Sequence, residues 1–323
     1  MDLDIADLRK VDPRALDALM GEEAELWLER LGWDYRPTQS FLRGYIKRHM
    51  LPGFAVFEGS RAQGYLYIVL EGDRGIVGNV YVARERWGDG LEGRLAAAAA
   101  EALQATPGVR RIEAQLLIFS GADVAGALGD AGFEIFRRHF LSLELNSRDD
   151  VREAPDGLEL RHWDNDKIGE ASRVVFEGYR GGVDAYFSSS FGRADRCREF
   201  VANLVRRAGC GRFLPTMSTV GFGPEGEMVG VVIATQLSDA VGHLPQISVA
   251  PEAQGRGFGT FLVAESLRRF RKAGYHSVSL TVTEENRRAY DWYLRFGFAD
   301  ILPFDAYLWL RPRGGEEGTP RPI

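Results

Sequence analysis

The sequence predicts a mixed α/β protein of two tandem domains, each with a mostly antiparallel central sheet flanked by helices. At 323 residues the chain is long enough for two domains. Its two halves repeat one order of elements: strand, glycine loop, helix, strand, helix. Gly90 and Gly257 are 167 positions apart, and the Gly-Phe pairs that begin at 132 and 297 are 165 apart. A near-constant offset with matching element order indicates an internal duplication.

The polar stretch NSRDDVREAPDG, residues 146–157, lacks apolar periodicity and lies near the midpoint. We therefore expect an N-terminal domain at 1–147, a linker at 148–156 and a C-terminal domain at 157–310. The remaining residues, 311–323, are rich in proline, glycine and charge, so we expect a disordered tail.

In each half, segments with helical spacing precede segments that alternate like strands. The expected helices are at 24–33 and 39–50 in the first half and at 168–180 and 194–208 in the second. The expected strands are at 55–59, 64–72 and 75–82, then at 213–222, 226–237 and 243–249, with a hairpin turn at 223–227.

Composition disfavours several classes of protein. A net charge of −6 argues against a nucleic-acid surface. No stretch approaches the roughly 18 apolar residues of a membrane span, and residues 1–10 are acidic, unlike a signal peptide, so we expect a cytoplasmic protein. Cys197 and Cys210 are expected to be reduced thiols, and the five scattered histidines predict no metal site. The basic run at 268–272 lies late in a predicted helix, where cations suit the helix dipole.

The segment QGRGFGT, residues 254–260, follows a strand that breaks at Pro251 and opens a helix. Glycine weakens the first turn of a helix, so its repeated use here needs a reason. Bare backbone N–H groups at a helix start form an anion site, to which Arg256 and Thr260 would add a guanidinium and a hydroxyl. The alternatives are a tight strand-to-helix turn and a solvent-facing arginine.

With these motifs the second half resembles the GCN5-related N-acetyltransferase (GNAT) superfamily, and the repeat makes the chain resemble a tandem member. The family's phosphate loop matches Gln254, Gly255, Arg256, Gly257, Phe258 and Gly259. Its downstream segment matches Asn286, Ala289, Tyr293, Gly297 and Phe298.

The resemblance implies that the loop binds the pyrophosphate of acetyl-coenzyme A, with no metal required. The strand residues Ile247, Ser248 and Val249 would part from the next strand and bind the pantetheine arm. Asn286 would lie near that arm, or cap the following helix instead. Tyr293 would be the general acid that protonates the leaving thiolate, or a packed core aromatic. An attacking amine also needs a base. His243 is our candidate for this base. The alternative is that His243 is a structural histidine and that the proton leaves through water.

The first half departs from this pattern. Trp87 and Glu92 occupy its loop positions, and a carboxylate there would repel a pyrophosphate. Gly121 stands in place of Asn286, and Leu128 in place of Tyr293. We expect this domain to have lost donor binding and to shape the acceptor cleft.

The resemblance predicts an N-acetyltransferase that moves an acetyl group to a primary amine by direct transfer in a ternary complex, in the C-terminal domain. The acceptor would be a small molecule or a peptide, with no nucleic-acid or membrane partner. The expected acceptor wall contains Tyr179, Arg180, Asp184, Tyr186 and Phe187. The alternatives are a non-catalytic acyl-coenzyme A binding module and a transferase of longer acyl groups.

Overall fold

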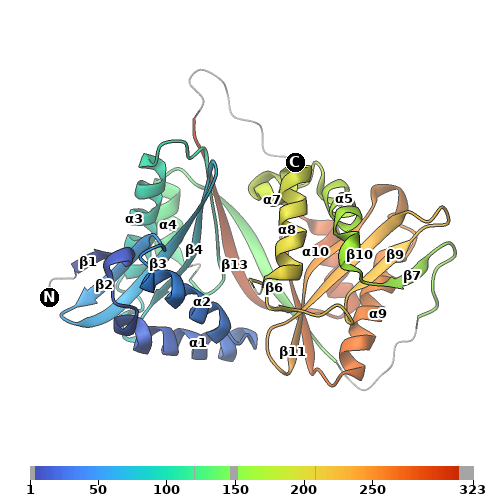
Figure 1. Ribbon diagram of the computed structural model, residues 1–323, viewed down its shortest axis with the longest axis horizontal. Coiled ribbons are helices and arrows are strands. Elements are labelled where there is room, and N and C mark those ends of the chain that lie inside the picture. The colour runs from blue at the N-terminus through green and yellow to red at the C-terminus, as the bar shows by residue number, and fades with distance from the viewer. Residues whose placement is uncertain (1–3, 120, 146–151, 208, 313–323) are drawn as a thin grey trace. The chain divides into compact units, whose positions relative to one another are not determined.

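The computed structural model describes residues 4–119, 121–145, 152–207 and 209–312, which form two compact units (Figure 1). Within these residues, unit 1 covers 4–138 and 302–312, and unit 2 covers 139–301. No helix in the described part of the chain has the length and hydropathy needed to cross a membrane.

Unit 1 contains an antiparallel meander followed by a strand-helix-strand-helix segment, as expected for the first half. Its strands are β1 (Asp4–Asp7), β2 (Gly53–Glu58), β3 (Arg61–Glu71), β4 (Arg74–Val82) and β5 (Arg111–Leu116). Its helices are α1 (Asp17–Leu31), α2 (Arg36–Lys47), α3 (Leu91–Ala105) and α4 (Ala122–Asp130), with 3₁₀ turns η1 (Leu8–Lys10), η2 (Pro13–Leu16) and η3 (Arg84–Arg86).

Unit 2 repeats this order with more helical turns near its start. Its strands are β7 (Glu159–His162), β8 (Arg212–Phe213), β9 (Thr219–Phe222), β10 (Met228–Gln236), β11 (Val241–Val249) and β12 (Ser277–Thr283). Its helices are α5 (Ile168–Tyr179), α6 (Val183–Phe187), α7 (Ser189–Gly192), α8 (Ala194–Arg206), α9 (Phe258–Lys272) and α10 (Arg287–Phe296), with η4 (Asn165–Lys167) and η5 (Pro251–Ala253).

The two remaining strands, β6 (Glu134–Glu144) and β13 (Ala299–Leu310), are exchanged between the halves of the sequence. The sheet of unit 1 has the order β1-β2-β3-β4-β5-β13, and β13 pairs antiparallel with β5 through Asp305 to Leu310. The sheet of unit 2 has the order β6-β12-β11-β10-β9-β7, with β8 beside β10. Each compact unit therefore includes a strand from the other half, so its limits differ from those of the domains expected at 1–147 and 157–310.

Each unit contains a parallel pair of strands that stop pairing before the strands themselves end. In unit 2, β11 pairs with β12 only from Val241 to His243, although β11 continues to Val249. The ladder stops where Leu244 and Pro245 oppose the single residue Ala234 of β10, which makes a β-bulge. Proline has no N–H to donate, so it does not extend the ladder. In unit 1, β4 likewise leaves β5 after Val77, next to a register shift.

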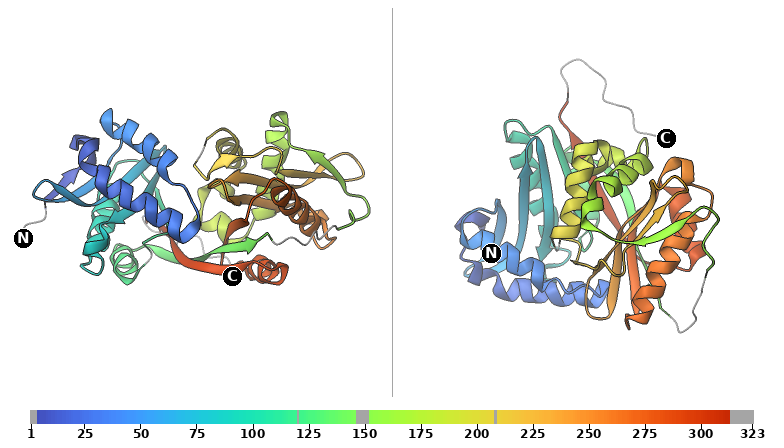
Figure 2. Two further views of the ribbon diagram at one scale, coloured as in Figure 1. Left: turned by 90° about the horizontal axis from the view of Figure 1, so that it is seen from below. Right: turned by 45° about the vertical axis from the view of Figure 1, so that its right-hand side comes forward.

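Helices cover both faces of each sheet. In the left panel of Figure 2, the strands of unit 1 run between α1 and α2 on one side and α3 and α4 on the other. In unit 2, α5 and α8 pack on one face against Val220, Val231 and Ile233. Helices α9 and α10 pack on the other face, against Val232 and Val278. The glycine loop before α9 thus starts a helix anchored by a continuous apolar core.

The mixed α/β fold with mostly antiparallel sheets is confirmed, and most expected elements lie within a few residues of their predicted limits. The expected strand at 213–222 is wrong as one element: it divides into β8 and β9. Between them, the amides of Met217 and Ser218 both donate to the carbonyl oxygen of Leu214, which closes a turn.

The predicted linker and tail fall partly outside the described residues, namely at 148–151 and 313–323. Residues 152–156 form neither helix nor strand. Arg311, at the start of the expected tail, donates from Nε to the carbonyl oxygen of Val109 at 2.6 Å.

The carboxylate of Glu23, on α1, is fully buried in unit 1. Gln39 Nε2 donates to its Oε2 at 2.9 Å, Asn79 Nδ2 donates to Oε1 at 2.6 Å, and the hydroxyl of Tyr65 donates to Oε2. Burial is the dominant influence and raises the pKa of this carboxyl to about 7.

This pKa predicts a stability that depends on pH. The folded carboxyl keeps its proton up to about pH 7, whereas the unfolded one loses it near 4.5. Between these values the folded state binds more protons, so the free energy of unfolding falls as pH rises, by up to about 3 kcal/mol. The Glu23→Gln variant should lose this slope, measured by urea unfolding at several pH values with hydrogen exchange of β3 amides. Parallel curves for wild type and variant would contradict the assignment.

Candidate functional site

The glycine loop joins the end of β11 to the start of α9. Gly255 and Gly257 have φ of 76° and 82°, in the left-handed region that favours glycine. Gly257 is the N-cap of α9, and no side chain caps the helix. A side chain at Gly255 would meet no other atom within 4 Å, so the space over this turn is open.

The amides of this loop are free to bind a ligand. The first backbone bond of α9 runs from the amide of Phe261 to the carbonyl oxygen of Gly257, at 3.0 Å. The amides of residues 255–260 donate no hydrogen bond to any residue in the described ranges. A run of unpaired N–H groups at the positive end of a four-turn helix fits an anion such as a pyrophosphate.

The side chains of the loop hold it in place. Phe258 is buried in a small core with Leu158, Val229 and Ala253, so it offers a ligand only its backbone. Gln254 donates from Nε2 to the carbonyl oxygen of Val249 at 3.1 Å and accepts from Arg288 at 2.9 Å.

Two loop positions remain available for contact with a ligand. Arg256 is exposed, and its guanidinium carbon lies 4.7 Å from the centroid of the Phe258 ring. Thr260 is half-buried in the first turn of α9. Gly259 has little spare room, because a Cβ there would lie 3.2 Å from Cγ2 of Val249.

The strand before the loop has a free edge. Ile247, Ser248 and Val249 pair with β10 on one side, but the parallel ladder to β12 has already ended at His243. Ile247 packs toward the α9 core. Ser248 points to the other face, where its Oγ lies close to Gly178 at the end of α5. The unpaired edge of an extended strand is a ready hydrogen-bonding template.

Tyr293, on α10, combines a packed ring with an unpaired hydroxyl. The ring lies 4.8 Å from Trp292 and 5.8 Å from Phe298, between centroids, within the core of unit 2. The hydroxyl makes no hydrogen bond to a described residue. Burial, followed by the nearby Tyr179 and Asp184, raises the pKa of Tyr293 well above its ordinary value. The hydroxyl therefore holds its proton throughout the physiological range.

Asn286 caps α10, as the alternative reading of this residue predicted. Its Oδ1 accepts a long hydrogen bond of 3.4 Å from the amide of Ala289. Its Nδ2 donates to Oδ2 of Asp184 at 3.3 Å. Thr283, at the end of β12, donates from Oγ1 to the other oxygen of Asp184 at 2.7 Å. Asp184 thus connects the expected acceptor wall by hydrogen bonds to Thr283 and Asn286, which follow the paired part of β12.

His243 is the last residue of β11 that pairs with β12. It is buried, its Nδ1 lies 2.9 Å from Oγ of Ser279, and its ring stacks on Phe140 at 5.9 Å. These contacts fix the imidazole at the point where the two strands separate, and they are compatible with either a structural histidine or a base.

Gln246 was missed by the sequence analysis. It is 1 % exposed, its Nε2 donates to Oγ of Ser248 at 3.0 Å, and its Oε1 is buried without a partner among the described residues. As the cross-strand partner of Ile233 it faces α5 and α8. A buried unpaired acceptor is uncommon and costs stability, which makes Gln246 a candidate for contact with a polar ligand. A lone glutamine in an apolar strand was the available signal.

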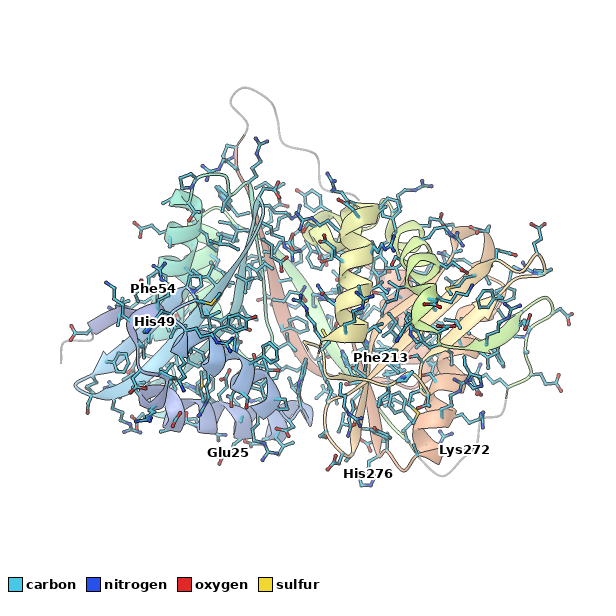
Figure 3. All side chains as sticks on the ribbon, in the orientation of Figure 1. Glu25, His49, Phe54, Phe213, Lys272 and His276 are labelled. Carbon is cyan, nitrogen blue, oxygen red and sulfur yellow. The ribbon has the colours of Figure 1, made fainter. Side chains whose placement is uncertain are left out.

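The other polar and charged residues singled out by the sequence have ordinary structural contacts. Arg268 and Arg269 pair with Glu265 inside α9. Lys272 ends that helix, about 20 Å from the glycine loop, and it and His276 are labelled in Figure 3. Burial raises the pKa of Cys197 to about 11, which makes it an inert thiol. No cluster of three potential metal-binding side chains occurs within the described residues.

The loop of unit 1 keeps the backbone of its counterpart but not its side chains. Gly88 and Gly90 have φ of 89° and 71°, and Gly90 is the N-cap of α3. Glu92 lies in the first turn, is 8 % exposed, and has one carboxylate oxygen buried without a partner among the described residues. Trp87 lies against Phe119 and two guanidinium groups, those of Arg30 and Arg84.

The positions that match Asn286 and Tyr293 also differ. Gly121 is the N-cap of α4 and offers no capping side chain, and Leu128 is fully buried. Unit 1 therefore keeps the left-handed glycines of the loop, but the first turn of its helix contains the Glu92 carboxylate, and Leu128 offers no hydroxyl at the position that matches Tyr293.

Comparisons with known proteins agree with this geometry. Residues 194–298 match the family model of the acetyltransferase (GNAT) family. An uncharacterized N-acetyltransferase of Methanocaldococcus jannaschii is 27% identical over 147 residues, which is 44% of this chain and 60% of that relative.

Two solved structures share the fold over nearly the whole chain. A GCN5-related N-acetyltransferase from Sphaerobacter thermophilus superposes with a TM-score of 0.68 at 17% identity, covering 96% of each chain. A tandem GNAT protein from the clavulanic acid biosynthesis pathway superposes with a TM-score of 0.63 at 18% identity, covering 97% of this chain and 100% of that one.

Proposed function

We propose that the chain is a tandem acetyltransferase of the GNAT superfamily, in which unit 2 transfers an acetyl group from acetyl-coenzyme A to a primary amine; the family match at 194–298 and the likeness to a tandem GNAT structure support this. One observation carries the proposal: the run of unpaired amides at residues 255–260 beside the free edge of β11. The amides would bind the pyrophosphate, and Ile247 to Val249 would bind the pantetheine arm along the strand. Asn286 would reach the same arm through its Nδ2 group.

The proposed chemistry is direct transfer in a ternary complex. His243, or a water molecule that it orients, would remove a proton from the acceptor's ammonium group. The neutral nitrogen would then bond to the thioester carbonyl carbon, and the carbon–sulfur bond would break. Tyr293 would donate its proton to the departing sulfur and then take up the second proton that the nitrogen loses on becoming an amide. One proton per turnover would remain on the base for release to solvent, so that protons and charges balance.

Two other functions remain as alternatives. A non-catalytic acyl-coenzyme A binding module would need the loop but no acid, and a longer acyl group would need more room at the end of the pantetheine site. The unpaired hydroxyl of Tyr293 favours an enzyme over a binding module. Release of free thiol over a panel of amines and acyl donors distinguishes the three functions.

Donor binding should depend on the loop of unit 2 alone. Isothermal titration of the whole chain with acetyl-coenzyme A should find one site, and Gly257→Glu should abolish it, because a carboxylate would face the pyrophosphate. Gly274→Glu is the matched control. Gly274 has φ of 85°, against 82° at Gly257, and follows the far end of α9, so the added charge is the same and the backbone strain is similar. A Cβ at Gly274 would meet no atom within 4 Å, and one at Gly257 would lie in ordinary contact with Pro155 at 3.6 Å. A second site, or one that survives Gly257→Glu, would contradict the interpretation of Glu92.

Removing the hydroxyl of Tyr293 should slow turnover without weakening donor binding. Tyr293→Phe keeps the ring's packing, so kcat should fall about 10²-fold or more while the donor's dissociation constant stays within about twofold. Tyr290→Phe is the control on the same helix, since the Tyr290 hydroxyl only donates to Asp300 at 3.2 Å. Turnover of Tyr293→Phe at the wild-type rate would leave Tyr293 a purely structural residue.

Replacing His243 should change how the rate depends on pH. If His243 accepts the amine's proton, His243→Ala should remove the acidic limb of the pH–rate profile. Ser279→Ala serves as the comparison, because it removes the contact at Nδ1 and the bond of the same hydroxyl to the Gly242 carbonyl oxygen but leaves the imidazole. A pH profile unchanged in His243→Ala would assign the base to water or to another group.

A further inference from the structure

The expected acceptor wall contains one buried carboxylate. Asp184 belongs to α6, is 6 % exposed and accepts two hydrogen bonds, one at each oxygen. The donors, Thr283 and Asn286, lie at the end of β12 and the start of α10. Its carboxylate is therefore fixed beside the place where β11 and β12 separate, 99 residues along the chain from Thr283.

Among the described residues, no lysine, arginine or histidine forms an ion pair with Asp184. A carboxylate offers about four acceptor positions, and two of these are filled. Buried charges in proteins are normally paired, because an isolated one is costly. The open acceptor positions and the missing partner are the two features that a bound cation would satisfy.

A second buried carboxylate shows what a purely structural one looks like here. Glu23 in unit 1 is fully enclosed and accepts three hydrogen bonds, from Gln39, Tyr65 and Asn79. Asp184 has fewer donors. It bonds to Asn286 at the start of α10, and Tyr293 follows two turns later on the same face of that helix. The charge of Asp184 is also a cause, after burial and Tyr179, of the raised pKa of Tyr293.

A polar acceptor on the same side of the sheet supports a ligand position. Gln246 faces the helices α5 and α8, and α6 belongs to the segment that joins those two helices. Its Oε1 is buried without a partner among the described residues. An ammonium group carries up to three N–H donors, so a bound amine would have acceptors to fill.

We propose that Asp184 binds the protonated amine of the acceptor, so the acceptor is a cationic primary amine held beside Tyr293. This inference rests on the proposed acetyl transfer and specifies the charge of its acceptor. Asp184 would select the acceptor by its positive charge. The proton that the bound ammonium group must lose before it attacks the thioester would go to His243 or to the water that His243 orients. Neutral amides and N-acetylated amines lack the charge that Asp184 requires.

The test uses the full chain with bound coenzyme A and three amine probes: spermidine, glycinamide and ethanolamine. Thermal shift measures their binding, and thiol release from acetyl-coenzyme A measures KM and kcat. For every probe active in the wild type, Asp184→Asn should raise the amine's KM at least tenfold. The dissociation constant of acetyl-coenzyme A should stay within about twofold, by calorimetry.

Thr283→Val is the matched control, because it removes the stronger bond that fastens α6 but leaves the carboxylate. If Asp184 acts through charge, Thr283→Val should keep the amine's KM within about threefold. The melting temperature adds a readout without substrate. Asp184→Asn should be at least as stable as the wild type, since it removes an unpaired buried charge.

Equal effects of Asp184→Asn and Thr283→Val on KM, or a less stable Asp184→Asn with unchanged KM, would make Asp184 a structural fastener and overturn the proposal. The absence of any amine-dependent signal in the donor-bound wild type would also overturn it. Failure of the wild type to bind acetyl-coenzyme A would instead refute the proposed function itself, so the two failures are distinguishable.

Discussion

The early end of the parallel ladder between β11 and β12 is the constraint on which the candidate site depends. After His243 the two strands share no further pairs, and a bulge that contains Pro245 makes continued pairing impossible at that point. The separation leaves an edge of β11 unpaired, which a sheet normally avoids. His243 is the last paired residue before the separation, and Asp184 is bonded to Thr283 at the end of β12. The loop amides at the start of α9 lie at the far end of β11.

The duplication shows which features belong to the fold and which to the chemistry. Both units part their parallel strands next to a bulge, and both turn into a helix through two left-handed glycines. These backbone features persist in unit 1 although Glu92, Gly121 and Leu128 stand where unit 2 has Gly259, Asn286 and Tyr293, the residues of the proposed donor site. The backbone of the loop is therefore maintained by packing of the sheet and helices, and the two loops differ in their side chains: Glu92 stands in unit 1 where unit 2 has Gly259. We propose that the side chains next to the loop determine whether it binds the donor.

Much of this was predictable because the signals are local. The glycine loop, its helix and the cap at Asn286 follow from residues within a few positions of one another. The exchange of β6 and β13 was not predictable, since an alternating strand pattern does not specify which sheet edge it joins. The divided strand at 213–222 depended on a turn at Leu214 that its apolar residues concealed. The contacts of Asp184 join segments a hundred residues apart, and no local pattern encodes such a pair.

The environment of Tyr293 gives a physical link between the acceptor and the acid. An efficient general acid has a pKa near the operating pH, whereas the pKa of Tyr293 lies well above its ordinary value. Burial is the main cause, followed by Tyr179 and Asp184. Burial persists in any complex, but a cation bound at Asp184 would cancel that carboxylate's charge and so lower the pKa of Tyr293. On this reasoning the hydroxyl becomes a better acid only when an amine is in place. The same carboxylate that selects the acceptor would then restrain hydrolysis of the donor in its absence.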